Sequence, residues 1–177
     1  MRLENINASE CYLVKAKEVY EYSFPPEERL DFDKALQRQD ERYQMKIILD
    51  ESDNAAGILF YWNFDTFVYI EHFAFSHSQR GKGQGGAVLK EFTTAQKLPV
   101  ILEIELPETP NAQRRLDFYQ RLGFVKNEYP YIQPPYSKEK PSVEMLILST
   151  EILTKNDFEE VKTTLYKEVY KVTVFGN

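Results

Sequence analysis

Runs of apolar residues along the chain predict a sheet whose strands are interleaved with helices. Tyr43 to Leu49 and Gly57 to Trp62 are predicted strands, joined by a turn at Asp50 to Ala55, because polar turn residues between two β-prone runs favour a hairpin. Further strands are predicted around Leu3 and Ile6 and at Phe67 to Phe75, Val100 to Leu106, Phe124 to Tyr131 and Val143 to Leu148. These runs predict a sheet of about seven strands.

Helical spacing of apolar residues, together with start and stop signals, predicts the remaining elements. Asn7 and Ser9 can cap the first helix, and Gly123 is placed to end a later one in the left-handed conformation. The predicted helices run to Tyr20, from Glu27 to Gln39, from Gly85 to Gln96, from Asn111 or Thr109 to Leu122, and from Asp157 to Tyr170, with a β-prone tail at Val172 to Phe175. This order predicts a mixed α/β (α+β) fold rather than a doubly wound one.

Composition narrows the class of protein. The chain has 177 residues, of which 42% are hydrophobic, so we expect one globular domain with a substantial core. The net charge is 22 − 28 = −6, which argues against a nucleic-acid partner, since such proteins carry a basic patch. An acidic surface is also compatible with a cationic, amine-bearing substrate.

Cysteine content and hydropathy bear on location. Cys11 is the only cysteine, so neither an intramolecular disulfide nor a thiolate zinc cluster can form. The first ten residues carry no apolar signal-peptide core, and no apolar run approaches the ~20 residues that span a bilayer. We therefore expect a cytoplasmic protein with no membrane partner.

A glycine-rich stretch, QRGKGQGG from Gln79 to Gly86, lies between a predicted strand and a predicted helix. Glycine lets the main chain approach a ligand closely, and a helix N-terminus offers unpaired N–H groups to a diphosphate. Arg80 and Lys82 would add positive charge. A plain flexible turn is the alternative. The stretch lacks the Lys-Ser or Lys-Thr of a Walker A loop, and its glycine spacing does not fit the dinucleotide-binding fingerprint.

The same stretch resembles the acetyl-CoA-binding motif of the GNAT N-acetyltransferases, with Arg80, Gly83 and Gly85 at its defining positions. The preceding YIEHFAF, the strand-like LEIE and the later RRLDFYQRLGF stand in the order typical of that family. The resemblance covers Phe67 to Phe124 well. It implies a single N-acetyltransferase domain over residues 1–177, with a core motif at 67–124 and a C-terminal extension at 150–177.

The resemblance also implies how acetyl-CoA, the co-substrate, is bound without a metal. The GNAT fold has a mixed, mostly antiparallel sheet that splays between its fourth and fifth strands, with flanking helices and, here, a C-terminal helix. The pantetheine arm would insert between the strand ending at Phe75 and that beginning at Val100, like a missing strand. The implied cofactor-binding residues are Phe73, Ala74, Phe75, Arg80, Gly81, Lys82, Gly83, Gln84, Gly85, Gly86 and Asn111.

Two catalytic roles follow from the resemblance. Tyr119 matches the tyrosine that returns a proton to the departing thiolate, although it could instead be a core aromatic. Glu71 is the candidate base that takes a proton from the acceptor ammonium. His72 would point to the opposite face unless a bulge intervenes, and a chain of waters is a further alternative.

Other positions are open. The family often has asparagine where this chain has Ala112, so Asn111 is one step away from that position. The acceptor pocket is expected at Phe24 to Arg29 and at Tyr131 to Tyr136, where aromatic and acidic residues suit a cation. Glu103 and Glu105 project from a central strand and one of them could border the same cleft.

The sequence therefore predicts an acetyl-CoA-dependent N-acetyltransferase that acts by direct attack in a ternary complex on a primary amine of a small molecule or peptide. A homodimer is compatible with the sequence. The alternative is a catalytically silent CoA-binding sensor or interaction module with the same fold. A kinase or nucleotide hydrolase is disfavoured, because the Walker residues are missing.

Overall fold

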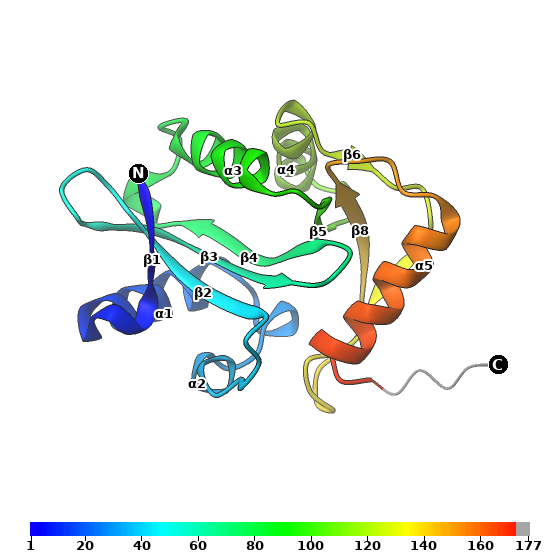
Figure 1. Ribbon diagram of the computed structural model, residues 1–177, viewed down its shortest axis with the longest axis horizontal. Coiled ribbons are helices and arrows are strands. Elements are labelled where there is room, and N and C mark those ends of the chain that lie inside the picture. The colour runs from blue at the N-terminus through cyan, green and yellow to red at the C-terminus, as the bar shows by residue number, and fades with distance from the viewer. Residues whose placement is uncertain (173–177) are drawn as a thin grey trace. The chain divides into compact units, whose positions relative to one another are not determined.

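The structure, a computed structural model, describes residues 1–172, and the chain divides into two compact units. The first unit comprises Met1–Pro26 and Leu30–Val100, and the second comprises Glu27–Arg29 together with the chain from Ile101 onward. Figure 1 follows the elements from the N-terminus in blue to the C-terminal helix in red. Apart from Val172, the predicted β-prone tail lies outside the described residues. The single-domain assignment stays a prediction.

Four antiparallel strands form the sheet of the first unit, in the order β1 (Arg2–Asn5), β2 (Tyr43–Leu49), β3 (Ala55–Asn63) and β4 (Val68–Phe75) (Figure 1). In the turn between β2 and β3, Asp50 Oδ1 accepts hydrogen bonds from the backbone N–H groups of Ser52 and Asn54. The predicted hairpin is confirmed. Ile6 belongs to a 3₁₀ turn, Ile6–Ala8, and not to the first strand.

Helices α1 (Glu10–Ser23) and α3 (Gln84–Ala95) cover opposite faces of this sheet. The Ser9 side chain caps α1 by accepting from the N–H of Cys11. Tyr20 of α1 packs on Phe60 with ring centroids 5.6 Å apart, whereas Phe92 of α3 packs on Tyr61 at 4.9 Å. Phe60 and Tyr61 are consecutive residues of one strand and so point to opposite faces.

The predicted helix from Glu27 to Gln39 is wrong in length, because α2 spans only Phe32–Leu36. A 3₁₀ turn occupies Pro26–Glu28. The Leu30 carbonyl accepts a hydrogen bond from the Tyr20 hydroxyl at 3.1 Å, and the Arg29 carbonyl accepts one from Lys140 Nζ. Since side chains occupy these carbonyls, the helix begins only after them, and the acidic start signal is overridden.

In the second unit, β8 (Val143–Ser149) pairs antiparallel with β5 (Val100–Glu105) along one edge and with β6 (Val125–Lys126) and β7 (Tyr131–Gln133) along the other. The single strand predicted over Phe124 to Tyr131 is wrong. The backbone N–H of Asn127 still donates to the Ile147 carbonyl, which also accepts from Asn127 Nδ2, but Pro130 further on has no N–H for a ladder. This break gives residues 1–172 eight strands.

Two longer helices complete the second unit, α4 (Pro110–Arg121) and α5 (Lys155–Thr164). Thr109 caps α4 by accepting from the N–H of Ala112, and Gly123 follows with the predicted positive φ of 93°. A capping box between Thr154 and Asp157 starts α5. The predicted helix to Tyr170 is regular only to Thr164 and continues as a π-helix, Leu165–Val169.

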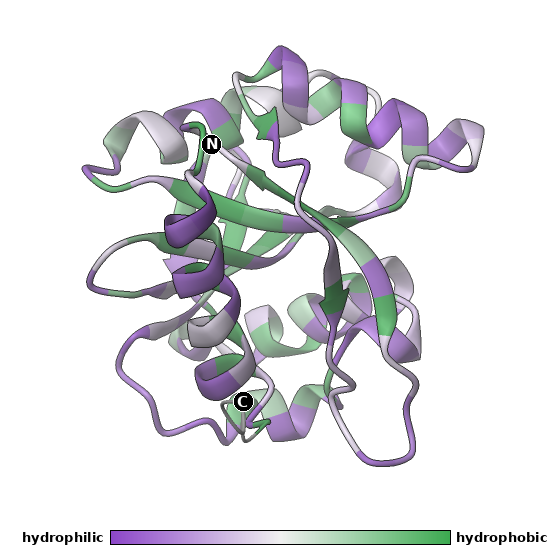
Figure 2. Cartoon of the chain, turned by 90° about the vertical axis from the view of Figure 1, so that its right-hand side faces the viewer, coloured by the Kyte–Doolittle hydropathy of each residue, from purple (hydrophilic) through white to green (hydrophobic). Residues whose placement is uncertain are grey.

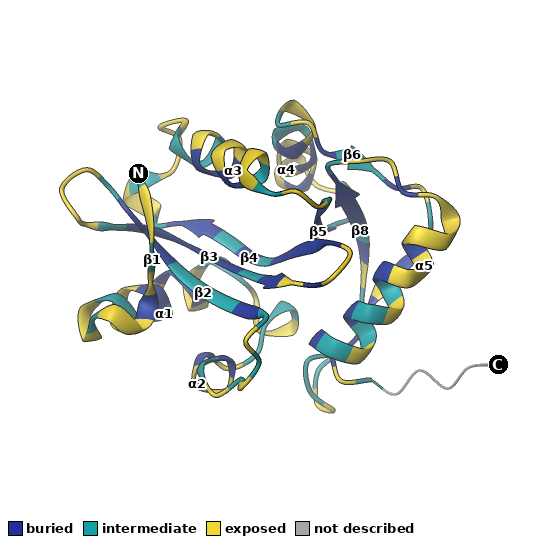
Figure 3. Ribbon diagram, in the orientation of Figure 1, coloured by how far each residue is buried: buried dark blue, intermediate teal, exposed yellow. Residues whose placement is uncertain are grey.

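The strands carry the core of each unit. Figure 2 shows hydrophobic residues concentrated on the strands, whereas the helices alternate between hydrophilic and hydrophobic faces. In Figure 3 strands β3, β4 and β5 are largely buried, whereas β1 and the outer sides of the helices are exposed. Within residues 1–172, no helix combines the length and the apolarity that a membrane span requires.

Candidate functional site

The glycine-rich stretch forms a loop between β4 and α3 with two residues in the left-handed region. Gly81 has φ 77° and Gly83 has φ 74°, a conformation that glycine adopts without steric cost. Gly83 is the N-cap of α3, and no side chain caps this end. The first-turn N–H groups of Gln84, Gly85 and Gly86 are therefore the kind of donor set that binds a phosphate at the positive end of a helix. The residues present fit a diphosphate.

Arg80 lies against α1 and the end of β4. Its Nε donates to the Phe75 carbonyl at 3.0 Å, its Nη2 donates to Ser23 Oγ at 2.8 Å, and its guanidinium lies 5.3 Å from the Tyr22 ring centroid. Lys82 Nζ donates to Gln79 Oε1 at 3.0 Å. Arg80 thus fixes the position of the loop, while Lys82 stays within the loop itself.

Strand β4 ends with Phe73, Ala74 and Phe75, before this loop. The register pairs them with Leu59, Ile58 and Gly57 of β3. A Cβ atom built on Gly57 would lie 2.4 Å from the Ala74 carbonyl oxygen, so only glycine permits this close approach of β3 and β4. The edge of Phe73 to Phe75 that faces β3 is therefore closely packed. These are the residues whose backbone the resemblance expects to bind pantetheine.

Glu71 occupies a bulge in β4. The pairing register shifts between Phe60 and Tyr61, which leaves Glu71 as the extra residue between His72 and Ile70. Its side chain is 1% exposed and accepts hydrogen bonds from Arg38 Nη1 at 2.6 Å and Trp62 Nε1 at 2.7 Å. Burial favours the neutral acid, but Arg38, His72 and Trp62 together outweigh it and lower the pKa of Glu71.

The same bulge brings His72 to the face occupied by Glu71. The His72 ring packs edge-on against Tyr20 at 4.7 Å and Phe24 at 4.5 Å, and its residue is 2% exposed. The sequence predicted that His72 would point to the opposite face from Glu71 unless a bulge intervened. The bulge is present. The structure places the two titratable groups side by side in the aromatic core of the first unit.

Tyr119 lies on the inner side of α4 in the second unit and is 8% exposed. Its ring packs edge-on against Phe124, with centroids 5.6 Å apart. Burial raises the pKa of Tyr119 to about 12, while Arg115 lowers and Glu105 raises it by smaller effects. The phenol is thus fully protonated at neutral pH.

Asn111 and Ala112 open α4. Asn111 is exposed, whereas Ala112 is 1% exposed and donates its N–H to Thr109 Oγ1 at 3.1 Å. Ala112, at the position where the GNAT family often has asparagine, is therefore buried in this protein. A cofactor contact by Asn111 stays a prediction.

Glu103 on β5 joins residues that the sequence pattern did not connect. It accepts hydrogen bonds from the hydroxyls of Tyr131 and Tyr170 and from Gln133 Nε2. Tyr170 was missed because a regular helix was expected around it. The sequence offers no signal for the contact, because consecutive buried residues also occur in the regular helices, as Val19 and Tyr20 do in α1.

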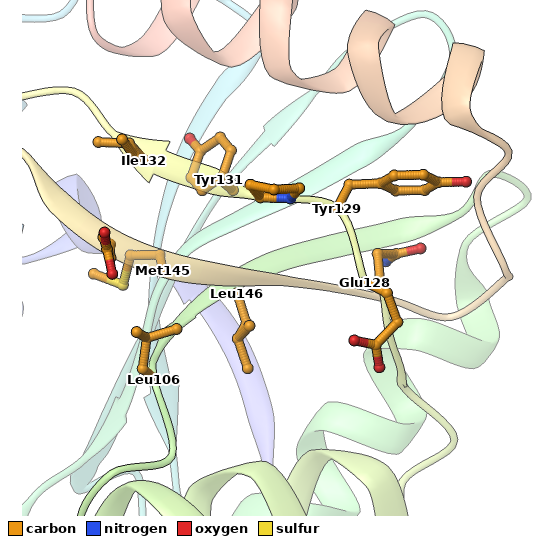
Figure 4. A pocket seen from close by; sticks show the side chains of 10 residues that line it. Leu106, Glu128, Tyr129, Tyr131, Ile132, Met145 and Leu146 are labelled. Atoms are coloured by element: carbon orange, nitrogen blue, oxygen red, sulfur yellow. The ribbon is translucent and has the colours of Figure 1, made fainter.

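A pocket of about 270 Å³ lies at the break between β6 and β7 (Figure 4). Leu106, residues 127–132 and residues 144–146 line it. Of the residues predicted for the acceptor pocket it includes Tyr131. Among residues 1–172, no group of three or more His, Cys, Asp or Glu side chains is placed to hold a metal ion.

Comparison with known proteins points to one family. The profile of the acetyltransferase (GNAT) family matches residues 8–124. A solved structure from Bacteroides thetaiotaomicron, provisionally assigned as an acetyltransferase of the GNAT family, is 32% identical, with a TM-score of 0.88 over 98% of this chain and 100% of that one. The provisionally assigned acetyltransferase YjbC of Bacillus subtilis (strain 168) is 33% identical over 79 residues, which are 44% of this chain and 41% of that protein. The match thus spans about two fifths of the length of this curated relative.

A more distant structure shares the fold. The spermidine N-acetyltransferase of Vibrio cholerae in complex with CoA and spermine is 12% identical, with a TM-score of 0.61 over 89% of this chain and 97% of that one. The predicted α/β fold with a mostly antiparallel sheet, flanking helices and a C-terminal helix is confirmed by the elements described above and by the Bacteroides structure.

Proposed function

The chain belongs to the acetyltransferase (GNAT) family, and from this premise we propose that it transfers the acetyl group of acetyl-CoA to a primary amine of a small molecule or peptide. One observation carries the proposal. The loop after β4 presents the N–H groups of an uncapped helix N-terminus, flanked by two glycines with positive φ, which is the donor set that a pyrophosphate requires.

On the donor side, the N–H groups from Gly81 to Gly86 would hold the pyrophosphate, with Lys82 adding charge. Arg80 would act by holding the loop on α1 through Ser23 and by its charge. The backbone from Phe73 to Phe75 would pair with the pantetheine amides, as an added strand pairs with a sheet edge. Asn111 is a further proposed contact. No metal takes part in this scheme.

The chemistry proposed is direct attack in a ternary complex. The acceptor ammonium loses a proton to Glu71 or to water, and its lone pair attacks the thioester carbonyl. A C–N bond forms, and the oxyanion of the tetrahedral intermediate is held by backbone N–H near Phe75. Collapse breaks the C–S bond, Tyr119 gives its proton to the thiolate, and the second proton of the attacking nitrogen, lost as the amide forms, returns Tyr119 to its neutral state. The lowered pKa of Glu71 keeps it ionised, as a base must be, but makes it a weak base, which favours the route through water.

Replacement of Tyr119 by phenylalanine separates its two interpretations. Phe keeps the ring that packs on Phe124 and removes only the proton donor. We expect kcat to fall at least 100-fold, on the order seen when a general acid is lost, with the Kd for CoA unchanged. Tyr12→Phe, on α1, is the control. Unchanged kcat in Tyr119→Phe would identify Tyr119 as a core aromatic only.

Thiol release from acetyl-CoA in the presence of a panel of amines tests the function, with CoA binding measured by titration calorimetry. Turnover with at least one amine is expected. Tight CoA binding without transfer to any amine would instead favour the alternative, a catalytically silent sensor or interaction module.

The acceptor is proposed to be a small amine. The Vibrio cholerae spermidine N-acetyltransferase binds spermine, which supports this class without identifying the substrate here. A cytoplasmic location and a homodimer remain predictions of the sequence.

A further inference from the structure

One face of the sheet in the second unit gathers carboxylates, phenols and an amide. On β5, Leu102 and Ile104 are buried on one side, so Glu103 and Glu105 project from the other. Glu105 lies opposite Met145 of β8, and Met145 lies opposite Tyr131 of β7. Directly paired residues share a face. Tyr131, and Gln133 two residues further on, therefore lie on the face of Glu103 and Glu105.

Three neutral groups orient the Glu103 carboxylate. The Tyr131 hydroxyl donates to Oε1, whereas Gln133 Nε2 and the Tyr170 hydroxyl donate to Oε2, the last at 2.6 Å. Neutral donors fix a carboxylate in place without neutralising its charge. These hydrogen bonds hold the Glu103 carboxylate in one orientation.

Gln133 supplies an independent sign of a ligand at this place. The residue is 4% exposed, and the bond from its Nε2 to Glu103 determines which way the amide is turned. Its Oε1 has no hydrogen-bond donor within residues 1–172. A buried acceptor without a donor is costly. A positively charged N–H group beside Glu103 would satisfy both the amide oxygen and the carboxylate.

The local potential favours a cation. Glu28, which belongs to this unit, interacts electrostatically with Glu105, Arg115 and Glu103. Burial and then the charges of Glu105 and Glu103 raise the pKa of Glu28, and they outweigh the lowering effect of Arg115. Glu105 is ion-paired with Arg115, and Glu28 lies within the electrostatic reach of both Glu105 and Glu103.

Aromatic rings surround the same carboxylate. The π-helix at Leu165–Val169 buries Val169 and Tyr170 together, at 3% and 6% exposure, and π-helical turns often occur at functional sites. The Tyr170 ring lies 4.9 Å from Tyr136, and Tyr131 lies 5.9 Å from Tyr166. Tyrosine faces attract cations, most strongly when water is excluded.

We propose that Glu103 and Gln133 Oε1, with the rings of Tyr131, Tyr136 and Tyr170, form a subsite for a second, non-reacting ammonium group of the acceptor. The acceptor class is then a diamine, or an amine that carries another cationic group. This assignment rests on the proposed acetyl transfer. The reacting nitrogen must lose its charge before it attacks, whereas a carboxylate beside an amide oxygen favours the charged form, so the subsite suits the nitrogen that does not react.

The test compares α,ω-diamines of three to six carbons with monoamines of the same length, in the wild-type protein. We expect kcat/KM for the best diamine to exceed that for its matched monoamine by about 10- to 100-fold. This is the factor in affinity that a hydrogen bond to a charged group typically contributes. Gln133→Leu and Glu103→Gln are expected to bring this ratio close to one by lowering the diamine value. Glu151→Gln, which changes an exposed carboxylate of the second unit, is the matched control and should keep the ratio.

A titration of each diamine and monoamine followed by NMR, without acetyl-CoA, gives a readout independent of turnover. Equal binding of diamines and monoamines by the wild-type protein would overturn the subsite, as would the same loss in Glu151→Gln as in Gln133→Leu. Because these comparisons do not require Glu103→Gln to fold, the proposal stays falsifiable if that variant unfolds. Absence of both CoA binding and turnover would overturn the acetyl transfer instead, and so the two failures are distinguishable.

Discussion

Glu71, the proposed base, is also part of a buried ion pair. Its side chain is 1% exposed and ion-paired with Arg38, whose guanidinium lies 4.8 Å from the Tyr43 ring and 5.0 Å from the Trp62 ring. Two rings and a carboxylate therefore surround the cation. Removal of one partner from such a pair leaves a buried charge unpaired, which costs more than the pair itself contributes.

We expect Glu71→Gln to lower the free energy of unfolding at neutral pH by about 3–5 kcal/mol, the cost of breaking a buried pair. The pKa of Glu71 is lowered in the folded state, so its contribution is present above the unfolded pKa of about 4.3 and is lost as pH falls through the lower folded pKa. The gap between wild type and variant should therefore narrow on acidification below that pH. Urea unfolding at a series of pH values measures it.

Glu18→Gln serves as the control, because the Lys15–Glu18 pair is exposed and such pairs contribute about 0–1 kcal/mol. A gap that stays constant from neutral to acid pH would contradict the ionised state assigned to Glu71.

The position of Glu71 on a strand before the glycine loop was predictable from the sequence, but its partner was not. Arg38 lies 33 residues away in the chain, in a segment whose helix ends earlier than its pattern indicates. Tyr170 and Glu103 are separated by 67 residues. No local pattern encodes contacts over such distances, and these contacts decide which polar groups are buried.

At the scale of the elements, the strands and helices with strong periodicity were predicted, and the exceptions have local causes. The predicted β2 coincides with the strand found, Tyr43–Leu49. The shortened α2 begins after carbonyls that accept side-chain hydrogen bonds from Tyr20 and Lys140, and the break between β6 and β7 contains Pro130, which has no N–H for a ladder. Residue propensities alone cannot predict such competition between side chains and the backbone.

The start of α3 leads to a prediction at this scale. Gly83→Ala is expected to cost about 1–2 kcal/mol in unfolding free energy, because a residue with a Cβ is strained at positive φ, and to weaken CoA binding by on the order of tenfold, equivalent to about 1.4 kcal/mol. A Cβ there meets no protein atom within 4 Å, so the loss would arise from the backbone and from the ligand.

Gly85→Ala is the matched control for this prediction. A Cβ at Gly85 would make an ordinary contact of 3.5 Å with the Phe75 ring, and alanine favours a helix over glycine by up to about 1 kcal/mol. Equal losses of CoA affinity in both variants would show that the loop conformation at Gly83 is not what the cofactor requires.

For the whole molecule, the order of strands, glycine loop and helices was enough to predict the fold class and the family, both now supported by the match over residues 8–124. The excess of acidic residues, 28 against 22 basic ones, argues against a general nucleic-acid binder but does not specify a substrate. Substrate specificity depends on a few buried polar groups, and the overall composition carries no information about single groups.

Because CoA should bind the folded state and not the unfolded state, it should stabilise the protein against unfolding. At a CoA concentration 100 times its Kd, the gain is about 2.7 kcal/mol, which for a chain of this size corresponds to a rise in Tm of roughly 5–10 °C. Differential scanning calorimetry with CoA, and with ATP at the same concentration, measures the effect. An equal or larger rise with ATP would argue for a nucleotide enzyme instead.

The two histidines of the chain, His72 and His77, give the protein a built-in spectroscopic contrast. His72 sits edge-on to the rings of Tyr20 and Phe24, so ring currents should displace its imidazole proton signals, whereas His77 opens the 3₁₀ turn before the glycine loop. With only two histidines in the sequence, a one-dimensional proton spectrum would separate a reporter of the aromatic core from a reporter of the loop, without any label.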